Sequence, residues 1–316
     1  MAEIFITRKV FKEASDILEK EQHTVEINDT DRILPVRELI KRAHGKAGLI
    51  SLLNDKIDSS VMDALPSIKV ISNIAVGYDN VDIAGATQRG IMVTNTPGVL
   101  TETTADLAFG LMLCTARRIA EADGYTRAGK FKNWQLIQAH MGIDLHKKTL
   151  GIVGMGAIGQ AVAKRARKGF EMRIVYCGSS RKEIAEKEYE AEFVEFDELL
   201  AISDFISIHV PLTEKTKHMF STLEYKKMKP TAILINTARG PVVDEAALVD
   251  AIKNSRIRGA ALDVFEEEPA IHPELIKLEE NVLLTPHIGS ASIETRLRMA
   301  KMAALNMVEG LKGNRP

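Results

Sequence analysis

Short apolar runs recur along the whole chain, and stretches with helical periodicity separate them, for example Asp244 to Asn254. Strands of a parallel sheet that helices cover on both faces read as continuous apolar runs, and a crossover helix joins one strand to the next. The alternation therefore predicts an α/β fold with doubly wound sheets. The predicted strands are residues 4–6, 48–50, 70–71, 91–93, 151–153, 173–175, 205–208, 232–235, 259–262 and 282–284.

Turn residues and two long helical stretches indicate two domains, and 316 residues are enough to bury two cores. The pattern breaks at Asn95–Gly98, before a helical stretch from Thr101 to about Ala120. A second stretch, Ser292 to about Leu311, follows the last predicted strand and is expected to return to the first domain. We therefore predict a discontinuous first domain, residues 1–98 with 289–316, and a second domain of residues 99–288.

Charge and composition exclude several classes of protein. The 42 basic and 43 acidic residues give a net charge of −1, so no global field attracts nucleic acid or anionic lipid. No apolar run suits a membrane span or a signal peptide. The only cysteines, Cys114 and Cys177, offer neither a disulfide framework nor a metal-binding spacing. We expect a soluble cytoplasmic protein with a small-molecule partner, no nucleic-acid or membrane partner, and no metal.

A glycine motif, Gly154-Met155-Gly156-Ala157-Ile158-Gly159, follows the predicted strand 150–153 and opens a helical stretch that ends near Lys168. A dinucleotide site needs this context: a tight turn, a backbone that can approach the pyrophosphate, and a helix N-terminus facing it. The alternative is a glycine-rich turn that binds nothing. The strand, turn and helix in this order favour a dinucleotide-binding Rossmann domain.

The turn after the next predicted strand, 172–176, indicates which dinucleotide binds. An acidic residue about 20 positions after the motif binds the adenosine ribose of NAD in such sites. Here the turn reads Cys177-Gly178-Ser179-Ser180-Arg181-Lys182, without a carboxylate. Hydroxyl groups and cations suit a ribose 2′-phosphate, because arginine pairs with phosphate oxygens through two hydrogen bonds. We predict that NADP(H) is preferred and NAD(H) is the second cofactor; the alternative is a solvated polar turn.

Three residues with catalytic chemistry follow predicted strands: Arg239, Glu268 and His287. Ligands of open α/β sheets bind at the carboxyl ends of the strands. Hydride transfer to a ketone leaves an alkoxide, which needs a proton donor such as histidine, and a cation such as arginine can bind a substrate carboxylate. A carboxylate beside the histidine would favour its protonated form and orient the ring. Taken singly, each residue also has a structural interpretation: a buried histidine, a turn-capping arginine or a solvated acidic loop.

Sequence blocks along nearly the whole chain carry a family resemblance. The blocks are Asn73-Ile74-Ala75-Val76-Gly77-Tyr78-Asp79-Asn80-Val81-Asp82, Asn95-Thr96-Pro97-Gly98-Val99-Leu100-Thr101-Glu102-Thr103-Thr104-Ala105-Asp106, Asn236-Thr237-Ala238-Arg239-Gly240, Ala261-Leu262-Asp263-Val264-Phe265, Glu268-Pro269 and Thr285-Pro286-His287-Ile288-Gly289. In this order they resemble the D-isomer specific 2-hydroxyacid dehydrogenase family, in particular its glyoxylate and hydroxypyruvate reductase branch. The resemblance implies a flavodoxin-like substrate domain, residues 1–98 with 289–316, and a Rossmann cofactor domain, residues 99–288.

The resemblance also implies roles for single residues. Arg239 would bind the substrate carboxylate and carbonyl, His287 would be the acid/base, and Glu268 would support His287. The backbone amides of Val76 and Gly77 would bind the carboxylate. Thr104 and Asp263 would contact the nicotinamide end. Ala157 stands where many relatives carry arginine, so pyrophosphate binding would rely more on backbone amides. The cofactor-binding residues expected in all are Thr104, Gly154, Met155, Gly156, Ala157, Ile158, Gly159, Ser179, Ser180, Arg181, His209, Val210, Pro211, Thr237, Ala238, Arg239, Asp263, His287 and Gly289.

The expected reaction is hydride transfer from NAD(P)H to a small 2-oxo acid, giving a D-2-hydroxy acid. Leu53 follows a predicted strand where the family's substrate loop lies, so we predict that it limits the substrate to glyoxylate or hydroxypyruvate. D-Lactate, phosphoglycerate or a larger 2-oxo acid remain alternatives, and a cofactor-sensing corepressor is an alternative of another class. A homodimer is expected by resemblance, with residues 101–120 and the arm of residues 124–146 around Trp134 as contact candidates.

Overall fold

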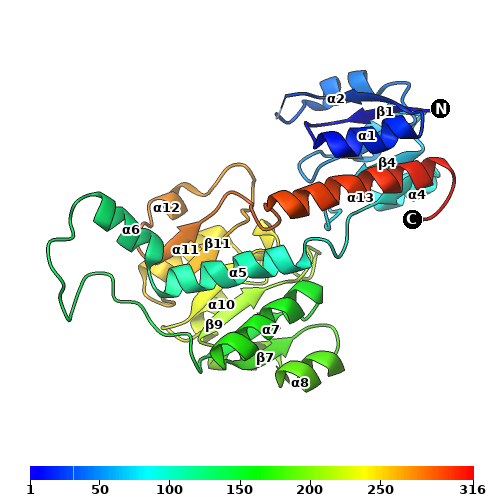
Figure 1. Ribbon diagram of the computed structural model, residues 1–316. Coiled ribbons are helices and arrows are strands. Elements are labelled where there is room, and N and C mark those ends of the chain that lie inside the picture. The colour runs from blue at the N-terminus through cyan, green and yellow to red at the C-terminus, as the bar shows by residue number, and fades with distance from the viewer. Residues whose placement is uncertain (31) are drawn as a thin grey trace. The chain divides into compact units, whose positions relative to one another are not determined.

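The computed structural model describes residues 1–30 and 32–316. The chain divides into two compact units, Met1–Leu100 with Ser290–Pro316 (unit 1) and Thr101–Gly289 (unit 2). The domains proposed from the sequence differ from these units in the assignment of Val99, Leu100 and Gly289. Each unit contains one parallel sheet with helices packed against it, which confirms the predicted α/β class (Figure 1).

Unit 1 contains a five-stranded sheet in the order β2-β1-β3-β4-β5. This is the flavodoxin-like order, as predicted. The strands are β1 (Glu3–Ile6), β2 (Thr24–Ile27), β3 (Gly48–Ser51), β4 (Val70–Asn73) and β5 (Met92–Thr94). The sequence analysis missed β2, because this edge strand is partly exposed and its residues alternate between polar and apolar instead of forming an apolar run.

The helices of unit 1 pack on its sheet. Two of them, α1 (Lys12–Lys20) and α13 (Ile293–Leu311), pack together, and α13 lies along β3, β4 and β5 (Figure 1). Ser292 begins α13 by accepting a hydrogen bond from the Thr295 amide, and Ser72 of β4 donates to the Ala303 carbonyl at 2.9 Å. An apolar core lies between the sheet and the helices α2 (Val36–Ala43), α3 (Ser59–Asp63) and α4 (Ile83–Gln88).

Unit 2 contains a seven-stranded sheet in the order β12-β11-β10-β9-β6-β7-β8. Counted from β6, this is the Rossmann order 3-2-1-4-5-6 with one further strand, as predicted. Sequence analysis missed β8, which has only two residues. The strands are β6 (Thr149–Val153), β7 (Arg173–Cys177), β8 (Glu192–Phe193), β9 (Phe205–Ile208), β10 (Ile233–Asn236), β11 (Gly259–Leu262) and β12 (Val282–Leu284).

Two apolar cores cover the sheet of unit 2. One is shared with α5 (Thr101–Ala116) and α7 (Ala157–Phe170), which pack against each other (Figure 1). The other is shared with α9 (Phe196–Ile202), α10 (Thr222–Lys227) and α11 (Glu245–Lys253). The remaining helices are α6 (Ile119–Arg127), α8 (Glu183–Tyr189), α12 (Pro273–Ile276) and the short 3₁₀ turn Gly240–Val242. No helix in the described part of the chain is long and apolar enough to cross a membrane.

The long helix predicted from Thr101 to Ala120 is wrong only in its last turn. It ends at Ala116, and Arg118 takes a left-handed conformation (φ +52°) before α6 begins. The side chain of Arg118 holds this break, because it donates to Glu121 and to the Ala139 carbonyl. The predicted loop 124–146 is therefore also corrected: its first four residues belong to α6, and residues 128–146 form an arm without helix or strand.

Candidate active site

The three predicted catalytic residues lie at one edge of the unit 2 sheet. Arg239, Glu268 and His287 follow β10, β11 and β12, which are neighbouring parallel strands. Oε2 of Glu268 lies 2.8 Å from Nδ1 of His287. Oε1 of the same carboxylate accepts from the Phe265 amide at 3.1 Å, which fixes the carboxylate. Among the described residues, Nε2 of His287 has no hydrogen-bond partner, so it is available to a ligand.

Asp263, directly after β11, holds the loop that carries His287. Its Oδ1 accepts from the Thr285 hydroxyl at 2.6 Å and from the Ile288 amide at 2.8 Å, and its Oδ2 accepts from the Gly289 amide at 2.7 Å. Burial raises the pKa of Asp263 above its ordinary value, although these hydrogen bonds oppose the shift. His287 itself has φ +52°, a left-handed backbone conformation that is uncommon for residues other than glycine. The carboxylate of Asp263 therefore stabilises the strained loop of the acid/base candidate.

The loop of Arg239 is held by Asn236, a residue whose role the sequence analysis missed. The fully buried Asn236 side chain donates to the Arg239 carbonyl at 2.9 Å and accepts from the Ala238 amide at 3.0 Å. The next residue, Gly240, packs so closely on the loop after β11 that a Cβ there would lie 1.8 Å from the Phe265 carbonyl oxygen. Arg239 thus projects from a loop that is pressed against the segment leading to Glu268.

The glycine motif has the geometry that a dinucleotide requires. Gly154 has φ +98°, and a Cβ at this position would meet the His209 carbonyl oxygen at 2.7 Å. A Cβ on Gly159 would meet the Gly154 carbonyl oxygen at 2.3 Å, so this glycine lets α7 pack closely on β6. A Cβ on Gly156 would meet no described atom within 4 Å, which leaves its backbone open to a ligand at the N-terminus of α7. These residues fit a pyrophosphate.

Further predicted cofactor residues also lie at the carboxyl edge of this sheet. The Thr237 hydroxyl is buried and has no hydrogen-bond partner among the described residues, so a bound ligand could satisfy it. The ring of His209 lies 2.8 Å from the Ser207 hydroxyl, and burial lowers the pKa of His209 to about 4. His209 is therefore neutral at neutral pH. The buried Thr104 lies beside Gly289, where a Cβ would be 3.7 Å from the threonine hydroxyl.

The turn after β7 contains an ion pair that the sequence analysis did not predict. Ser179, Ser180 and Arg181 are exposed, as a ligand contact requires. The Arg181 guanidinium, however, already donates to Glu186 of α8 through Nε at 3.0 Å and Nη2 at 2.9 Å. The Arg181 guanidinium in turn holds the pKa of the Glu186 carboxyl below its ordinary value. The turn itself lacks a carboxylate, but α8 supplies one.

In unit 1, the side-chain amides of the buried Asn73 and the half-buried Asn95 hold the segment of Val76 and Gly77. Asn95 donates to the Val76 carbonyl at 2.8 Å, and Asn73 donates to the Gly77 carbonyl at 3.1 Å. Within the described residues, the backbone N–H groups of Val76 and Gly77 donate to no protein group. Their carbonyls are thus anchored and their N–H groups remain available for a carboxylate.

The predicted substrate loop of unit 1, which carries Leu53, is fixed in the same way. Asn80 donates to the carbonyls of Leu52 and Asp55 at 3.1 and 2.9 Å. The Leu52 amide donates to the Asp55 carboxylate at 2.8 Å. Asn80 belongs to a sequence block quoted above, but its role could not be inferred from that block, because both carbonyls belong to a loop more than twenty residues away.

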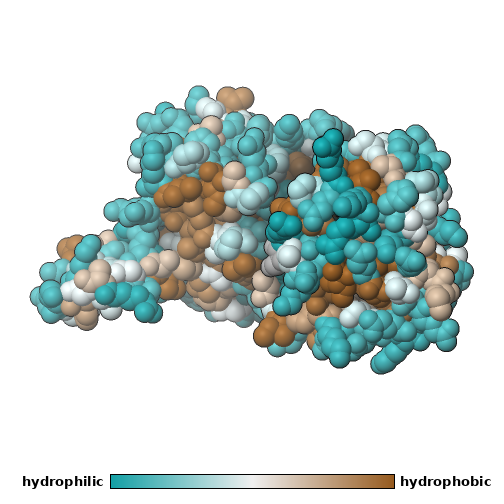
Figure 2. All heavy atoms as spheres, turned by 90° about the horizontal axis from the view of Figure 1, so that it is seen from above, coloured by the Kyte–Doolittle hydropathy of each residue, from teal (hydrophilic) through white to brown (hydrophobic). Residues whose placement is uncertain are grey.

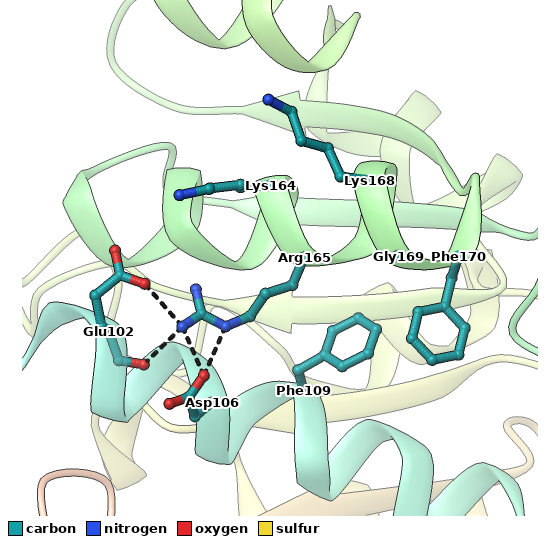
Figure 3. A pocket seen from close by; sticks show the side chains of 8 residues that line it. All are labelled: Glu102, Asp106, Phe109, Lys164, Arg165, Lys168, Gly169 and Phe170. Carbon is teal, nitrogen blue, oxygen red and sulfur yellow. Dashed lines mark hydrogen bonds and ion pairs between the residues drawn. The ribbon is translucent and has the colours of Figure 1, made fainter.

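A surface groove of about 620 Å³ lies between α5 and α7, and none of the predicted catalytic, cofactor-binding or substrate-binding residues lines it. Figure 3 shows that Arg165 reaches from α7 to Glu102 and Asp106 of α5, with distances of 2.8 and 2.6 Å from its Nη2. The rings of Phe109 and Phe170 lie 5.0 Å apart in the same groove. These contacts fasten the two helices to each other.

Comparison with known proteins gives the class of this protein. The family model "D-isomer specific 2-hydroxyacid dehydrogenase, NAD binding domain" matches residues 109–289. A glyoxylate reductase of Thermococcus litoralis is 50% identical, and the alignment covers 99% of this chain and 95% of the relative. The chain therefore belongs to the D-isomer specific 2-hydroxyacid dehydrogenase family, as the resemblance implied, and is an NAD(P)-dependent dehydrogenase.

Two solved structures support the same conclusion. A protein of Thermus thermophilus has a TM-score of 0.93 at 44% identity, covering 99% of this chain and 98% of that one. An NADPH-dependent glyoxylate/hydroxypyruvate reductase of Sinorhizobium meliloti, solved with NADP and malonate, has a TM-score of 0.86 at 32% identity, covering 98% of this chain and 93% of that one.

Proposed function

We propose that this enzyme reduces glyoxylate and hydroxypyruvate to the corresponding 2-hydroxy acids with NAD(P)H. The observation that carries the proposal is the Glu268–His287 pair, which leaves Nε2 of His287 free at the sheet edge that also bears Arg239 and the dinucleotide motif. Unit 2 is proposed to bind the cofactor, and unit 1 to contribute Leu53, Val76 and Gly77 to substrate binding. The relative from Thermococcus litoralis, named a glyoxylate reductase, supports the choice of substrate.

The three catalytic residues have different tasks in this mechanism. A nicotinamide cofactor held by the Gly154–Gly159 motif would supply the hydride for the carbonyl carbon of the 2-oxo acid. Nε2 of His287 donates a proton to the carbonyl oxygen, so the product is a neutral hydroxyl group and His287 ends neutral. Glu268 orients the ring through Nδ1 and stabilises its protonated form before transfer. Arg239 binds the carboxylate and polarises the carbonyl.

His287→Asn tests the mechanism. The variant should lose turnover, because no other residue is proposed to protonate the alkoxide, whereas the Kd of the cofactor should change little. Turnover is measured by the change in cofactor absorbance, and the Kd of the cofactor by calorimetry. A variant with full activity across the pH range would remove His287 from the mechanism.

The identity of the substrate is tested with a panel of 2-oxo acids. Leu53 lies on the proposed substrate loop and should limit the space beside the reacting carbon, so glyoxylate and hydroxypyruvate should give a higher kcat/KM than branched or aromatic acids. One methylene group is worth only about 1–3 kcal/mol in such a pocket. A higher kcat/KM with phenylpyruvate than with glyoxylate would contradict the proposed substrate. No turnover of any 2-oxo acid would favour the cofactor-sensing alternative.

We propose further that NADPH is preferred over NADH. The exposed turn Ser179-Ser180-Arg181 offers hydroxyl groups and a cation to a 2′-phosphate and has no carboxylate of its own. The relative from Sinorhizobium meliloti, described as NADPH-dependent and solved with NADP, supports this preference. The remaining predicted contacts, from Thr104 to Gly289, are proposed for both cofactors.

We also propose a cytoplasmic homodimer. The arm of residues 128–146 exposes large apolar side chains, with exposed fractions of 57% for Phe131, 72% for Trp134, 78% for Leu136 and 81% for Ile137. Figure 2 shows the arm as a projection with mixed apolar and polar surface. A second copy of the chain could cover these side chains. Both cysteines are free, which suits a reducing compartment. A monomeric mass in sedimentation equilibrium would contradict the dimer.

A further inference from the structure

Glu186 occupies a position from which it can interfere with a phosphate bound at Arg181. Its two carboxylate oxygens accept from the Arg181 guanidinium at 3.0 and 2.9 Å, and Oε1 also accepts from the Tyr176 hydroxyl at 2.7 Å. The Glu186 side chain is 24% exposed, whereas that of Arg181 is 68% exposed. Within this ion pair, the surrounding protein therefore encloses Glu186 more than it encloses Arg181.

Tyr176 is what fixes Glu186. Its ring is fully buried in β7 and packs edge-on against Phe193 with 5.3 Å between ring centroids. Its hydroxyl donates to Glu186 and accepts from the Lys182 amide at 2.7 Å. The buried phenol thus ties the start of α8 and the carboxylate to the strand end, and Glu186 cannot move away from the turn without breaking this hydrogen bond.

We propose that Glu186 is a specificity-determining residue. By competing with the 2′-phosphate for Arg181, it lowers the preference of the enzyme for NADP(H) over NAD(H). This inference rests on the proposed binding of the 2′-phosphate at the turn after β7. A phosphate must either displace the carboxylate from Nε and Nη2 of Arg181 or share the guanidinium with it, and the two anions repel each other. The hydroxyl group of an NAD(H) ribose carries no charge and meets no such repulsion. The enzyme is accordingly expected to retain measurable use of NADH.

Glu186→Gln is the decisive variant, because the amide keeps the size of the side chain and an oxygen acceptor for Tyr176 but removes the charge. The readout is the ratio of Kd values for NAD⁺ and NADP⁺ from isothermal titration calorimetry. Exposed charge pairs contribute little, so a rise in selectivity for NADP⁺ of about three- to fivefold is expected. High salt should reduce this difference. The matched control is Glu183→Gln, which makes the same charge change at an exposed position of the same helix and should leave the ratio unchanged.

Arg181→Ala separates failure of this inference from failure of the proposed cofactor site. If Arg181→Ala lowers selectivity for NADP⁺ and Glu186→Gln leaves the ratio unchanged or lowers it, the competition is refuted while the site stands. If Arg181→Ala leaves the ratio unchanged, the 2′-phosphate is not bound at Arg181. Both the proposed phosphate site and the proposed competition by Glu186 are then overturned. Should Glu186→Gln fold poorly by circular dichroism, Glu186→Ala serves as the second charge-removing variant, with the same expected rise and the same refuting result.

Discussion

Asp263 holds the loop of His287 through three hydrogen bonds. Replacing Asp263 with alanine measures how much these bonds contribute to catalysis. The replacement leaves the Thr285 hydroxyl and the Ile288 and Gly289 amides without their acceptor. Each donor that stays buried costs about 1–3 kcal/mol. Gly289 is buried, but Ile288 is 36% exposed, so water can reach part of the site. The variant also removes a buried carboxylate whose raised pKa shows that burial disfavours its charge.

These opposing effects lead us to expect a loss of about 1–3 kcal/mol in the free energy of unfolding. Catalysis should suffer more. His287 has a left-handed backbone (φ +52°) that persists only where surrounding contacts hold it. Displacing a reacting group by 1 Å can cost about 10²-fold in rate. We therefore expect kcat for glyoxylate to fall about 100-fold, with a smaller change in the Kd of the cofactor.

Asp244→Ala is the control for stability. Asp244 begins α11 by accepting from the Ala247 amide at 2.9 Å, and loss of such a cap costs about 0.5–2 kcal/mol. It should destabilise unit 2 to a similar extent without lowering kcat. Unfolding is followed by circular dichroism in urea, and kcat by cofactor absorbance. If Asp263→Ala keeps kcat within about twofold of the native enzyme, the loop does not depend on Asp263 and the reasoning from transition-state positioning fails.

Two further predictions concern other parts of the molecule. Asn80→Ala removes the donor to the carbonyls of Leu52 and Asp55, so it should raise KM for the 2-oxo acid by about tenfold while the Kd of the cofactor is retained; an unchanged KM would show that the loop does not need Asn80. Hydrogen bonds from two lysines lower the pKa of Glu274 to about 2. Its charged form therefore stabilises the folded state above pH 4.5, the ordinary pKa, and this stabilisation is lost as the pH falls towards 2. The difference in melting temperature between native enzyme and Glu274→Gln should therefore shrink over that range, and a difference that grows on acidification would contradict the assignment.

The sequence predicted the fold better than it predicted the details of the turns. Continuous apolar runs marked the buried strands, because those strands are covered on both faces. They could not mark β2 or β8, since β2 alternates at the edge and β8 has two residues. The break at Arg118 has no glycine or proline to signal it. It depends on a hydrogen bond from the Arg118 side chain to the Ala139 carbonyl, a contact between distant segments.

The candidate site shows the same limit. Residues with their own chemistry, such as Arg239 and His287, could be predicted from the strand ends and the family blocks. Glu186 could not, because its proposed effect depends on its ion pair with Arg181 and on its hydrogen bond from the buried hydroxyl of Tyr176. A helix position rich in charged neighbours gives no sign of which carboxylate faces the turn after β7. Only the hydrogen bond from the Tyr176 hydroxyl, at the end of β7, selects it.

Both units position their functional loops by one device, a buried polar side chain at the end of a strand. Asn73 ends β4 and donates to the Gly77 carbonyl; Asn236 ends β10 and donates to the Arg239 carbonyl; Asp263 follows β11 and accepts from the His287 loop. All three side chains are 0–1% exposed. Because each binds backbone groups, the loop conformation depends on donor and acceptor geometry and only weakly on the side chains that the loop presents. Residues proposed to contact the substrate from these loops can therefore change and alter specificity, while the strand-end residues must keep both their size and their hydrogen-bonding pattern.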